Sequence, residues 1–316
     1  MPRSCSRLSA GLLLLMSGVA TAQFAPQTPA KGVRLDKQVT QRWQVGVKIT
    51  VRGLPCSAVR GSVPVPKDWP EQQVRVVNEE VSPLVRVGNL RDSGGVRQMP
   101  FFIQQLPPGE VATALVTFEI TRSSMLPPDD PAQYLIPKNL PAAIRPELAA
   151  SPLIESRHPS IRDKAKELWP DNGSAWEQIQ TLYDWVRENI KLQDGKLKGA
   201  VAALRDGNGN RDDVTSLFIA LCRASGVPAR TVFVPDNCYA EFYLQDPEGT
   251  GYWFPCQLAG TREFGGMSDH RTILQKGDNI KVPDEPNPQR FVPEYLSGKG
   301  PGQPQVEFIR KVLPAN

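Results

Sequence analysis

The hydrophobic pattern changes its period once along this chain of 316 residues, and the change predicts two folding units of different class. Between residues 38 and 122, apolar residues alternate with polar residues or glycine, as in WQVGVKITV at residues 43–51. Alternation with period two is typical of strands that bury one face. Turn signals such as Pro107-Pro108-Gly109 separate these runs. We therefore expect an antiparallel β-sandwich over residues 38–124.

Helical periodicity begins at residue 160, after residues 125–159, whose composition is that of a linker. Ser174 and Glu177 form a predicted capping box, and an apolar stripe at helical spacing follows to residue 190. A second helix follows the loop at residues 207–210, and Gly226 and Pro228 end it. A strand at 230–234 and a hairpin around Pro247 come next. This order predicts an α+β domain over residues 160–280, followed by a Pro-rich C-terminal extension at 281–316 with a final short strand near 305–312.

The first 22 residues predict a signal peptide. Arg3 and Arg7 precede the apolar run at residues 8–20, and Ala20-Thr21-Ala22 forms a small-x-small cleavage pattern. We therefore expect an exported protein, periplasmic or extracellular, with a flexible lead-in at residues 23–37. The alternative is a membrane anchor, although a run of about 13 residues is too short to span a bilayer.

The charge balance argues against nucleic acid or an anionic membrane as a partner. The whole chain carries a formal charge of +4, and removal of Arg3 and Arg7 leaves 35 basic and 33 acidic residues, a balance of +2. The two histidines, His158 and His270, and the four scattered cysteines that remain give no metal-ligand spacing, so we expect no metal and no cofactor. The pattern indicates nothing about oligomeric state.

A disulfide between Cys238 and Cys256 is predicted by the hairpin. A turn centred on Pro247 places the two cysteines opposite each other on neighbouring strands. Export would favour the oxidised form. The alternative is a pair of small buried thiols.

Three segments carry a resemblance to a known family. They are RDDVTSLFIALCRASGVPAR (211–230), NCYAEFYLQDPEGTGYWFPCQ (237–257) and ILQKGDN (273–279). Together they resemble the transglutaminase-like family of the papain-like superfamily, and the similarity covers roughly residues 155–280. The resemblance implies a papain-like α+β domain with a catalytic Cys at a helix N-terminus, a His on the adjacent strand and an Asp on the next. In this sequence the three positions hold Arg211, Asn237 and Gln257.

These substitutions remove the chemistry that the resemblance implies. Arg211 offers no nucleophile, and the amide of Asn237 does not titrate near pH 7. Gln257 retains an oxygen that can orient an imidazole. We therefore expect no catalytic residues and an exported pseudoenzyme, a peptide-binding, protein-binding or scaffold module. A third interpretation is purely structural, with Arg211 filling the cleft.

The alternative function is an active cysteine peptidase, amidase or transamidase that uses residues outside the usual triad positions. The candidates are weak: Cys222 lies about 16 Å further along the same helix, and Cys238 faces the opposite side of its strand from Asn237.

Arg211 also raises an electrostatic question, because a cation at a helix N-terminus opposes the helix dipole. We expect an internal pair with Asp212, Asp213 or Glu241 to offset this. The alternative is an external anion bound beside Arg211.

Overall fold

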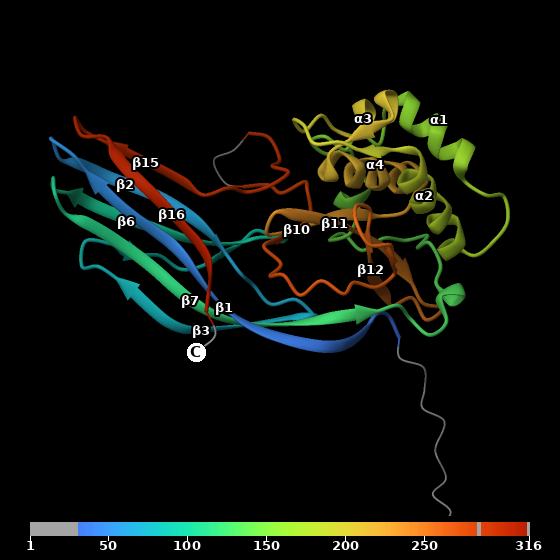
Figure 1. Cartoon of the computed structure of the whole chain (residues 1–316), viewed down its shortest axis with the longest axis horizontal. Coiled ribbons are helices and arrows are strands. Elements are labelled where there is room, and N and C mark those ends of the chain that lie inside the picture. The colour runs from blue at the N-terminus through green and yellow to red at the C-terminus, as the bar shows by residue number, and fades with distance from the viewer. Residues whose placement is uncertain (1–30, 283–285, 315–316) are drawn as a thin grey trace, which may run out of the picture.

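The computed structural model describes residues 31–282 and 286–314, and in it a β-sandwich and an α+β domain lie side by side along the long axis of the molecule (Figure 1). The predicted signal peptide, residues 1–22, and residues 23–30 of the lead-in lie outside the described residues. Among the residues described, no helix is both long and apolar enough to cross a membrane.

The sandwich consists of two antiparallel sheets. The first has the order β16-β1-β7-β3, with β1 at Arg34–Val51, β3 at Gln72–Val81, β7 at Val111–Leu126 and β16 at Pro304–Leu313. The second has the order β15-β2-β6-β4, with β2 at Cys56–Val65, β4 at Arg86–Val87, β6 at Arg97–Leu106 and β15 at Tyr295–Lys299. The short strand β5, Arg91–Asp92, also pairs with β6. The predicted sandwich is therefore present.

The alternating residues of β1 and β7 form much of the sandwich core. Val45, Val47 and Ile49 are at most 1% exposed, as the period-two pattern predicts. Gly46 lies between them at φ +154°, where an added Cβ would come within 2.0 Å of the Ala114 carbonyl oxygen. Only glycine fits there, because the backbones of β1 and β7 approach each other closely at this point.

The boundaries of the sandwich differ from the predicted ones at both ends of the chain. Strand β1 begins at Arg34, inside the predicted flexible lead-in, and β7 continues to Leu126. The C-terminal extension also supplies a strand to each sheet, because β16 pairs with β1 and β15 pairs with β2. The strand predicted near residues 305–312 is present as β16, whereas β15 was missed, because its exposed edge position leaves little alternation to detect in the sequence.

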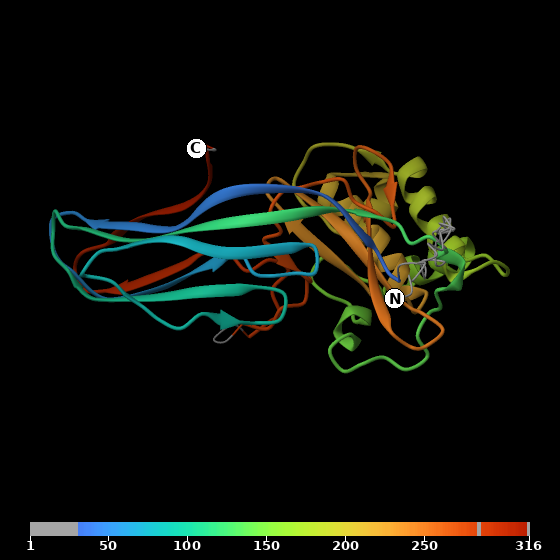
Figure 2. The same cartoon turned by 90° about the horizontal axis from the view of Figure 1, so that it is seen from below.

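The α+β domain packs four helices on an antiparallel sheet. The helices are α1 (Pro159–Leu168), α2 (Ala175–Asn189), α3 (Ala200–Asp206) and α4 (Arg211–Ala224). The sheet has the order β13-β12-β11-β10-β14, with β10 at Ala229–Val234, β11 at Asn237–Gln245, β12 at Gly251–Gln257, β13 at Glu263–Phe264 and β14 at Gln275–Lys276. A parallel pair, β8 (Lys191–Leu192) and β9 (Asn208–Gly209), lies before α4. Figure 2 shows the helices gathered at the end of the molecule away from the sandwich.

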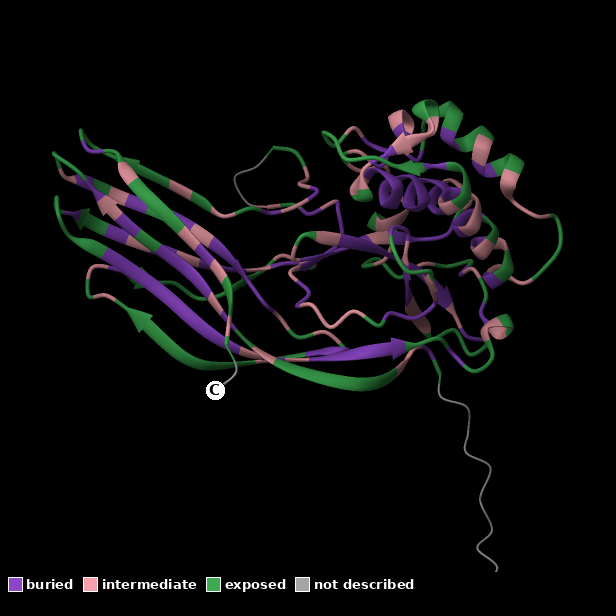
Figure 3. Ribbon diagram, viewed as in Figure 1, coloured by how far each residue is buried: buried purple, intermediate pink, exposed green. Residues whose placement is uncertain are grey.

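Helix α4 is the buried centre of this domain. Every residue from Asp213 to Arg223 is buried (Figure 3), so the helix is enclosed on all sides rather than amphipathic. Helix α2 begins with the predicted capping box: Ser174 Oγ accepts a hydrogen bond from the Glu177 amide, and Glu177 Oε2 accepts one from the Ser174 amide at 2.8 Å. This capping box fixes where α2 starts.

The predicted linker, residues 125–159, packs against the α+β domain instead of connecting freely. It contains two 3₁₀ turns, η1 (Pro131–Gln133) and η2 (Arg145–Leu148). Tyr134 and Ile154 are fully buried in the domain core, and Leu135 pairs with Gln245 at the end of β11. Single apolar residues spaced irregularly give no periodic signal, so the sequence pattern did not reveal this packing.

The predicted Cys238–Cys256 disulfide is wrong, because the hairpin register differs. Asp246 and Thr250 close the turn: the Asp246 amide donates to the Thr250 carbonyl, and the Thr250 amide donates to Asp246 Oδ1, both at 2.8 Å. This turn is centred on Glu248, one residue later than predicted, and the partner of each residue moves by two. Cys256 therefore lies opposite Ala240. The four cysteines in the described part of the chain are all buried free thiols.

Candidate functional site

Three element ends meet at one pocket. Helix α4 begins at Arg211, strand β11 begins at Asn237 and strand β12 ends at Gln257. All three side chains line a cavity of about 480 Å³. The structure thus brings together three residues that lie up to 46 positions apart in the sequence and that the resemblance places in a catalytic triad.

The start of α4 is fixed by a capping box. Asn210 Oδ1 accepts a hydrogen bond from the Asp213 amide, and Asp213 Oδ2 accepts one from the Asn210 amide. Asp213 Oδ1 accepts two more, from the amides of Lys198 and Gly199 at 2.8 Å each. The carboxylate of Asp213 therefore holds the loop before α3 against the first turn of α4, at the pocket's edge.

Arg211 does not form the predicted internal ion pair. Asp212 pairs with Arg290 at 3.0 Å, and the carboxylate of Asp213 is occupied by three backbone amides, those of Lys198, Gly199 and Asn210. Glu241 pairs with Arg230 and Lys276. Arg211 itself is exposed, and no carboxylate in the described residues contacts it. The prediction failed because the partners that occupy these acids come from distant parts of the chain.

The carboxamides of Asn237 and Gln257 also lack partners within the described residues. The Oδ1 atom of Asn237 and the Oε1 atom of Gln257 are buried and accept no hydrogen bond. Buried polar atoms are usually hydrogen-bonded, so two unpartnered atoms in one small pocket are unusual. Both side chains are only partly buried as a whole, which leaves their amino ends at the pocket.

The wall that carries Gln257 is held in place by helix α2. The Arg187 guanidinium donates to three carbonyl oxygens of one segment, those of Gln257 at 2.9 Å, Leu258 at 3.0 Å and Gly260 at 2.8 Å. Tyr183 Oη also donates to the Gln257 carbonyl at 2.8 Å. Sequence reasoning missed Arg187, because it lies on the polar side of an amphipathic helix, where charged residues are ordinary.

The remaining charged residues of the pocket have partners of their own. Arg271 pairs with Asp269 and donates to the Pro235 carbonyl at 3.0 Å. Glu263 Oε1 accepts a hydrogen bond from the Ser268 amide at 2.9 Å. These contacts fix the far side of the pocket and leave Arg211 as its unpaired cation among the residues described.

None of the described thiols lines the pocket. Cys238 follows Asn237 on β11 but faces α4, where burial and the nearby Asp212 carboxylate raise the pKa of its thiol to about 12. Cys222 is fully buried inside the domain, and burial raises the pKa of its thiol well above the usual range. Both thiols are therefore protonated at neutral pH, and neither lines the pocket.

Neither histidine lies at the pocket either. The His158 side chain caps helix α1 by accepting a hydrogen bond from the Ser160 amide. His270 Nε2 lies 3.0 Å from the Lys37 carbonyl oxygen in strand β1. Within the described residues, no three His, Cys, Asp or Glu side chains gather in a way that would hold a metal ion.

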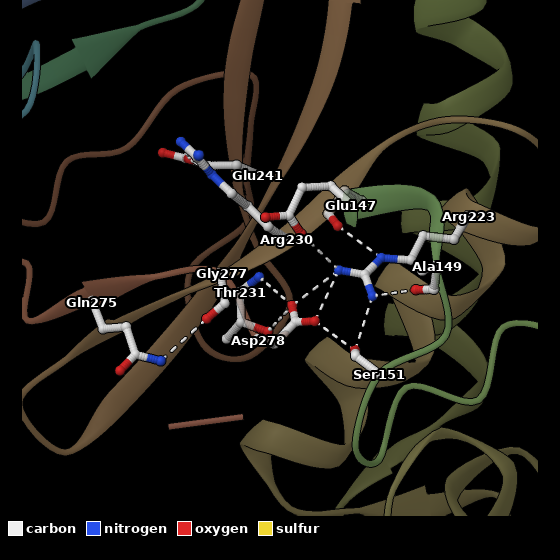
Figure 4. Close-up of polar contacts among 11 residues, drawn as sticks. Glu147, Ala149, Ser151, Arg223, Arg230, Thr231, Glu241, Gln275, Gly277 and Asp278 are labelled. Carbon is white, nitrogen blue, oxygen red and sulfur yellow. Dashed lines mark hydrogen bonds and ion pairs between the residues drawn. The ribbon is translucent and has the colours of Figure 1, made fainter. Parts of the chain in front are cut away.

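A second polar cluster surrounds the other end of α4 (Figure 4). The side chain of Arg223 is fully buried and donates to five acceptor groups, on Ala229, Ala149, Ser151, Glu147 and Asp278. Asp278 also accepts hydrogen bonds from the amide and hydroxyl of Thr231 and from the Ser151 hydroxyl. The charges of Arg223 and Asp278 thus neutralise each other inside the protein.

The two carboxylates of this cluster differ in pKa. Burial alone would raise the pKa of Asp278, but Arg223 and the hydrogen-bond donors outweigh it and lower the pKa. Burial and the charge of Asp278 raise the pKa of Glu147 to about 7, because Arg223 compensates only in part. The cluster lies away from the pocket lining and ties η2 and β14 to helix α4.

Glu241 and Lys276 tie the domain to the sandwich. Lys276 Nζ contacts Glu241 at 2.5 Å and Glu71 at 2.6 Å, and Glu71 lies just before strand β3. Burial alone would raise the pKa of Glu241, but Lys276 and Arg230 lower it to about 2. The Arg230 guanidinium also lies 3.9 Å from the centre of the Trp253 ring. This chain of contacts fixes the pocket-bearing sheet against the sandwich.

Comparison with known proteins agrees with this geometry. The family model described as transglutaminase-like superfamily matches residues 162–258, which include all three triad positions. A crystal structure described as that of a "Putative Cysteine Protease" from Cytophaga hutchinsonii matches with a TM-score of 0.54 and 16% identity, over 89% of this chain and 93% of that one. No curated protein matches the sequence. Residues 162–258 are therefore similar to the transglutaminase-like superfamily, and the chain as a whole shares the fold of that crystal structure, with a β-sandwich joined to the α+β domain.

Proposed function

We propose that the protein is an exported transglutaminase-like pseudoenzyme that binds an extended peptide or protein segment in the pocket at Arg211, Asn237 and Gln257, without thiol catalysis. One observation carries this proposal: the three positions line a common cavity, but none of them supplies a thiol, an imidazole or a carboxylate.

The chemistry of acyl transfer explains why these residues would not sustain turnover. A nucleophile must attack the carbonyl carbon, and a base near pH 7 must take its proton. The guanidinium of Arg211 is not a nucleophile, and the amide of Asn237 cannot act as a base. Because the members of a catalytic unit act together, the loss of nucleophile and base removes nearly all of the rate.

Two features of the pocket support a binding role. Its volume of about 480 Å³ lies within the usual range of ligand sites. The three hydrogen bonds from Arg187 hold the Gln257–Gly260 wall in one conformation, so a ligand would not have to order it.

The proposal is tested first by enzyme assay. The purified mature protein is incubated with a fluorescent amine and a glutamine-containing protein, and separately with fluorogenic peptides, with and without iodoacetamide. We expect no turnover above buffer, while an active transglutaminase and papain serve as positive controls. Turnover that iodoacetamide abolishes would show that the alternative, an active cysteine enzyme, is correct.

Binding is tested with a peptide library and a pocket-filling variant. Thr261 lies exposed on the pocket lining, so Thr261→Trp fills the cavity without disturbing the core. Thr181→Trp places the same side chain on the exposed face of α2 as a matched control. Peptides captured by the parent protein should be lost only with Thr261→Trp. Equal capture by both variants would place binding elsewhere.

Export is tested separately by N-terminal sequencing of the protein from the producing cells. Cleavage after Ala22 gives a mature chain that begins at Gln23. A retained Met1 in fractionated cells would argue against export.

A further inference from the structure

We infer that the pocket recognises its peptide through a carboxylate, from an acidic side chain or a chain end, which pairs with the guanidinium of Arg211 and the amino groups of Asn237 and Gln257. This inference rests on the proposed function, since it names the ligand chemistry of the same pocket.

The first observation is the unbalanced charge of Arg211. Of the two cations that line the pocket, Arg271 is neutralised by Asp269. Each acid close to Arg211 is engaged by other groups: Asp212 by Arg290, and Asp213 by three backbone amides. The described chain thus leaves one positive charge of the pocket without a counter-ion.

The second observation is the orientation of the two carboxamides. Asn237 Oδ1 and Gln257 Oε1 are buried and therefore unavailable to a ligand. The polar end of each side chain that remains for a ligand is its amino group, which donates hydrogen bonds only. A guanidinium and two amino groups give the pocket three donors from three elements, α4, β11 and β12. Such a surface favours a ligand rich in acceptors.

The charge balance indicates a carboxylate rather than a more highly charged anion. Glu263 and Asp269 also line the pocket, so the four charged lining residues sum to zero. Because Glu263 and Asp269 repel any anion in proportion to its charge, a singly charged carboxylate suits the one guanidinium without a counter-ion better than a doubly charged phosphate does. A carboxylate is planar and accepts two parallel hydrogen bonds from a guanidinium.

The experiment compares three labelled peptides of one background sequence. The first is capped at both ends and has a central glutamate, the second has glutamine at that place, and the third has glutamine and a free C-terminal carboxylate. Affinities for the intact mature protein are measured by titration calorimetry at low and physiological salt. We expect at least one carboxylate-bearing peptide to bind at least tenfold more tightly than the neutral one. The tighter of the two identifies whether an acidic side chain or a chain end is the source.

Two variants show whether Arg211 supplies this preference. Arg211→Gln should remove the difference between the charged and neutral peptides. Arg262→Gln deletes a cation from the β12–β13 connection that pairs with Asp184 and does not line the pocket, so the preference should remain.

The outcomes separate this inference from the proposed function. If all three peptides bind equally and Thr261→Trp abolishes binding, the pocket binds peptides but carboxylate recognition is wrong. A carboxylate preference that survives in Arg211→Gln also overturns the inference. If no peptide binds, both the inference and the proposed binding role fail.

Discussion

The two ends of helix α4 carry arginines in opposite situations. Arg223, near the C-terminal end, is fully buried and donates to five acceptor groups. Arg211, at the N-terminal end, is exposed, and no carboxylate within the described residues contacts it. A buried charge needs a counter-charge and hydrogen bonds inside the protein, because its desolvation is costly. An exposed charge remains hydrated and is free to pair with a ligand. The difference indicates a structural role for Arg223 and supports our proposal that a ligand binds at the end that carries Arg211.

The largest expected effect is at the buried end. Asp278→Ala leaves the Arg223 guanidinium buried without its main counter-charge and should reduce the free energy of unfolding by about 3–5 kcal/mol. Urea unfolding measures this change. Asp163→Ala, at an exposed position on α1, is the control and should stay within about 0.5 kcal/mol of the parent. A similar small effect for both would mean that the Arg223 cluster contributes little.

Glu147 gives the same cluster a pH dependence. Because folding raises the pKa of Glu147 from 4.5 to about 7, its contribution to stability is fully present below pH 4.5 and is lost as the pH rises to about 7. Relative to Glu147→Gln, the parent protein should lose up to about 3 kcal/mol between pH 4.5 and 8. Urea midpoints at several pH values test this. Parallel curves for the two proteins would contradict the raised pKa.

The pocket wall should show an intermediate effect. Arg187→Met removes hydrogen bonds from a charged donor to three carbonyls while keeping much of the side-chain volume. We expect a loss of about 2 kcal/mol in the free energy of unfolding. Peptide affinity should also fall, because the wall that carries Gln257 is no longer held. Unchanged affinity would show that the wall does not need this support.

The smallest effect is expected at the exposed end. Arg211→Ala should change the free energy of unfolding by no more than about 0.5 kcal/mol, because the arginine makes no internal ion pair. Thermal or urea unfolding provides the measurement. A clear destabilisation would reveal an internal role for Arg211 and remove the contrast with Arg223.

The sequence predicted those parts of the fold that depend on local signals. The capping box at Ser174, the stop at Gly226 and Pro228, and the alternation in β1 each act within a few residues. A final strand was predicted near residues 305–312, where β16 lies, but its pairing with β1 was not predicted, and neither was β15 on β2, because both places are decided by strands more than 200 residues earlier. The centre of the hairpin turn was missed by one residue, and the register by two, because the Asp246 side chain selects the turn.

The candidate site, too, was predictable from the sequence only in part. The resemblance located Arg211, Asn237 and Gln257, and the structure shows that they share a pocket. Whether Arg211 forms an ion pair was not predictable from the sequence, because the answer depends on which basic side chains pair with the nearby acidic residues. Arg290 and Lys276, which hold Asp212 and Glu241, lie 78 and 35 residues away from them. No local pattern reports such pairings.

The most direct test introduces a cysteine and a histidine at the positions where the resemblance places the catalytic nucleophile and base. If Arg211 and Asn237 occupy the positions of a nucleophile and its base, the thiol of an Arg211→Cys variant should react with iodoacetamide at pH 6 at least tenfold faster when Asn237→His is also present, because a neighbouring imidazolium lowers the thiol pKa. The parent protein is the control, since its four described cysteines are buried, and peptide mass spectrometry identifies the alkylated residue. The same rate with and without Asn237→His would show that the two positions do not form a catalytic pair, and the assignment of a degenerate triad would be wrong.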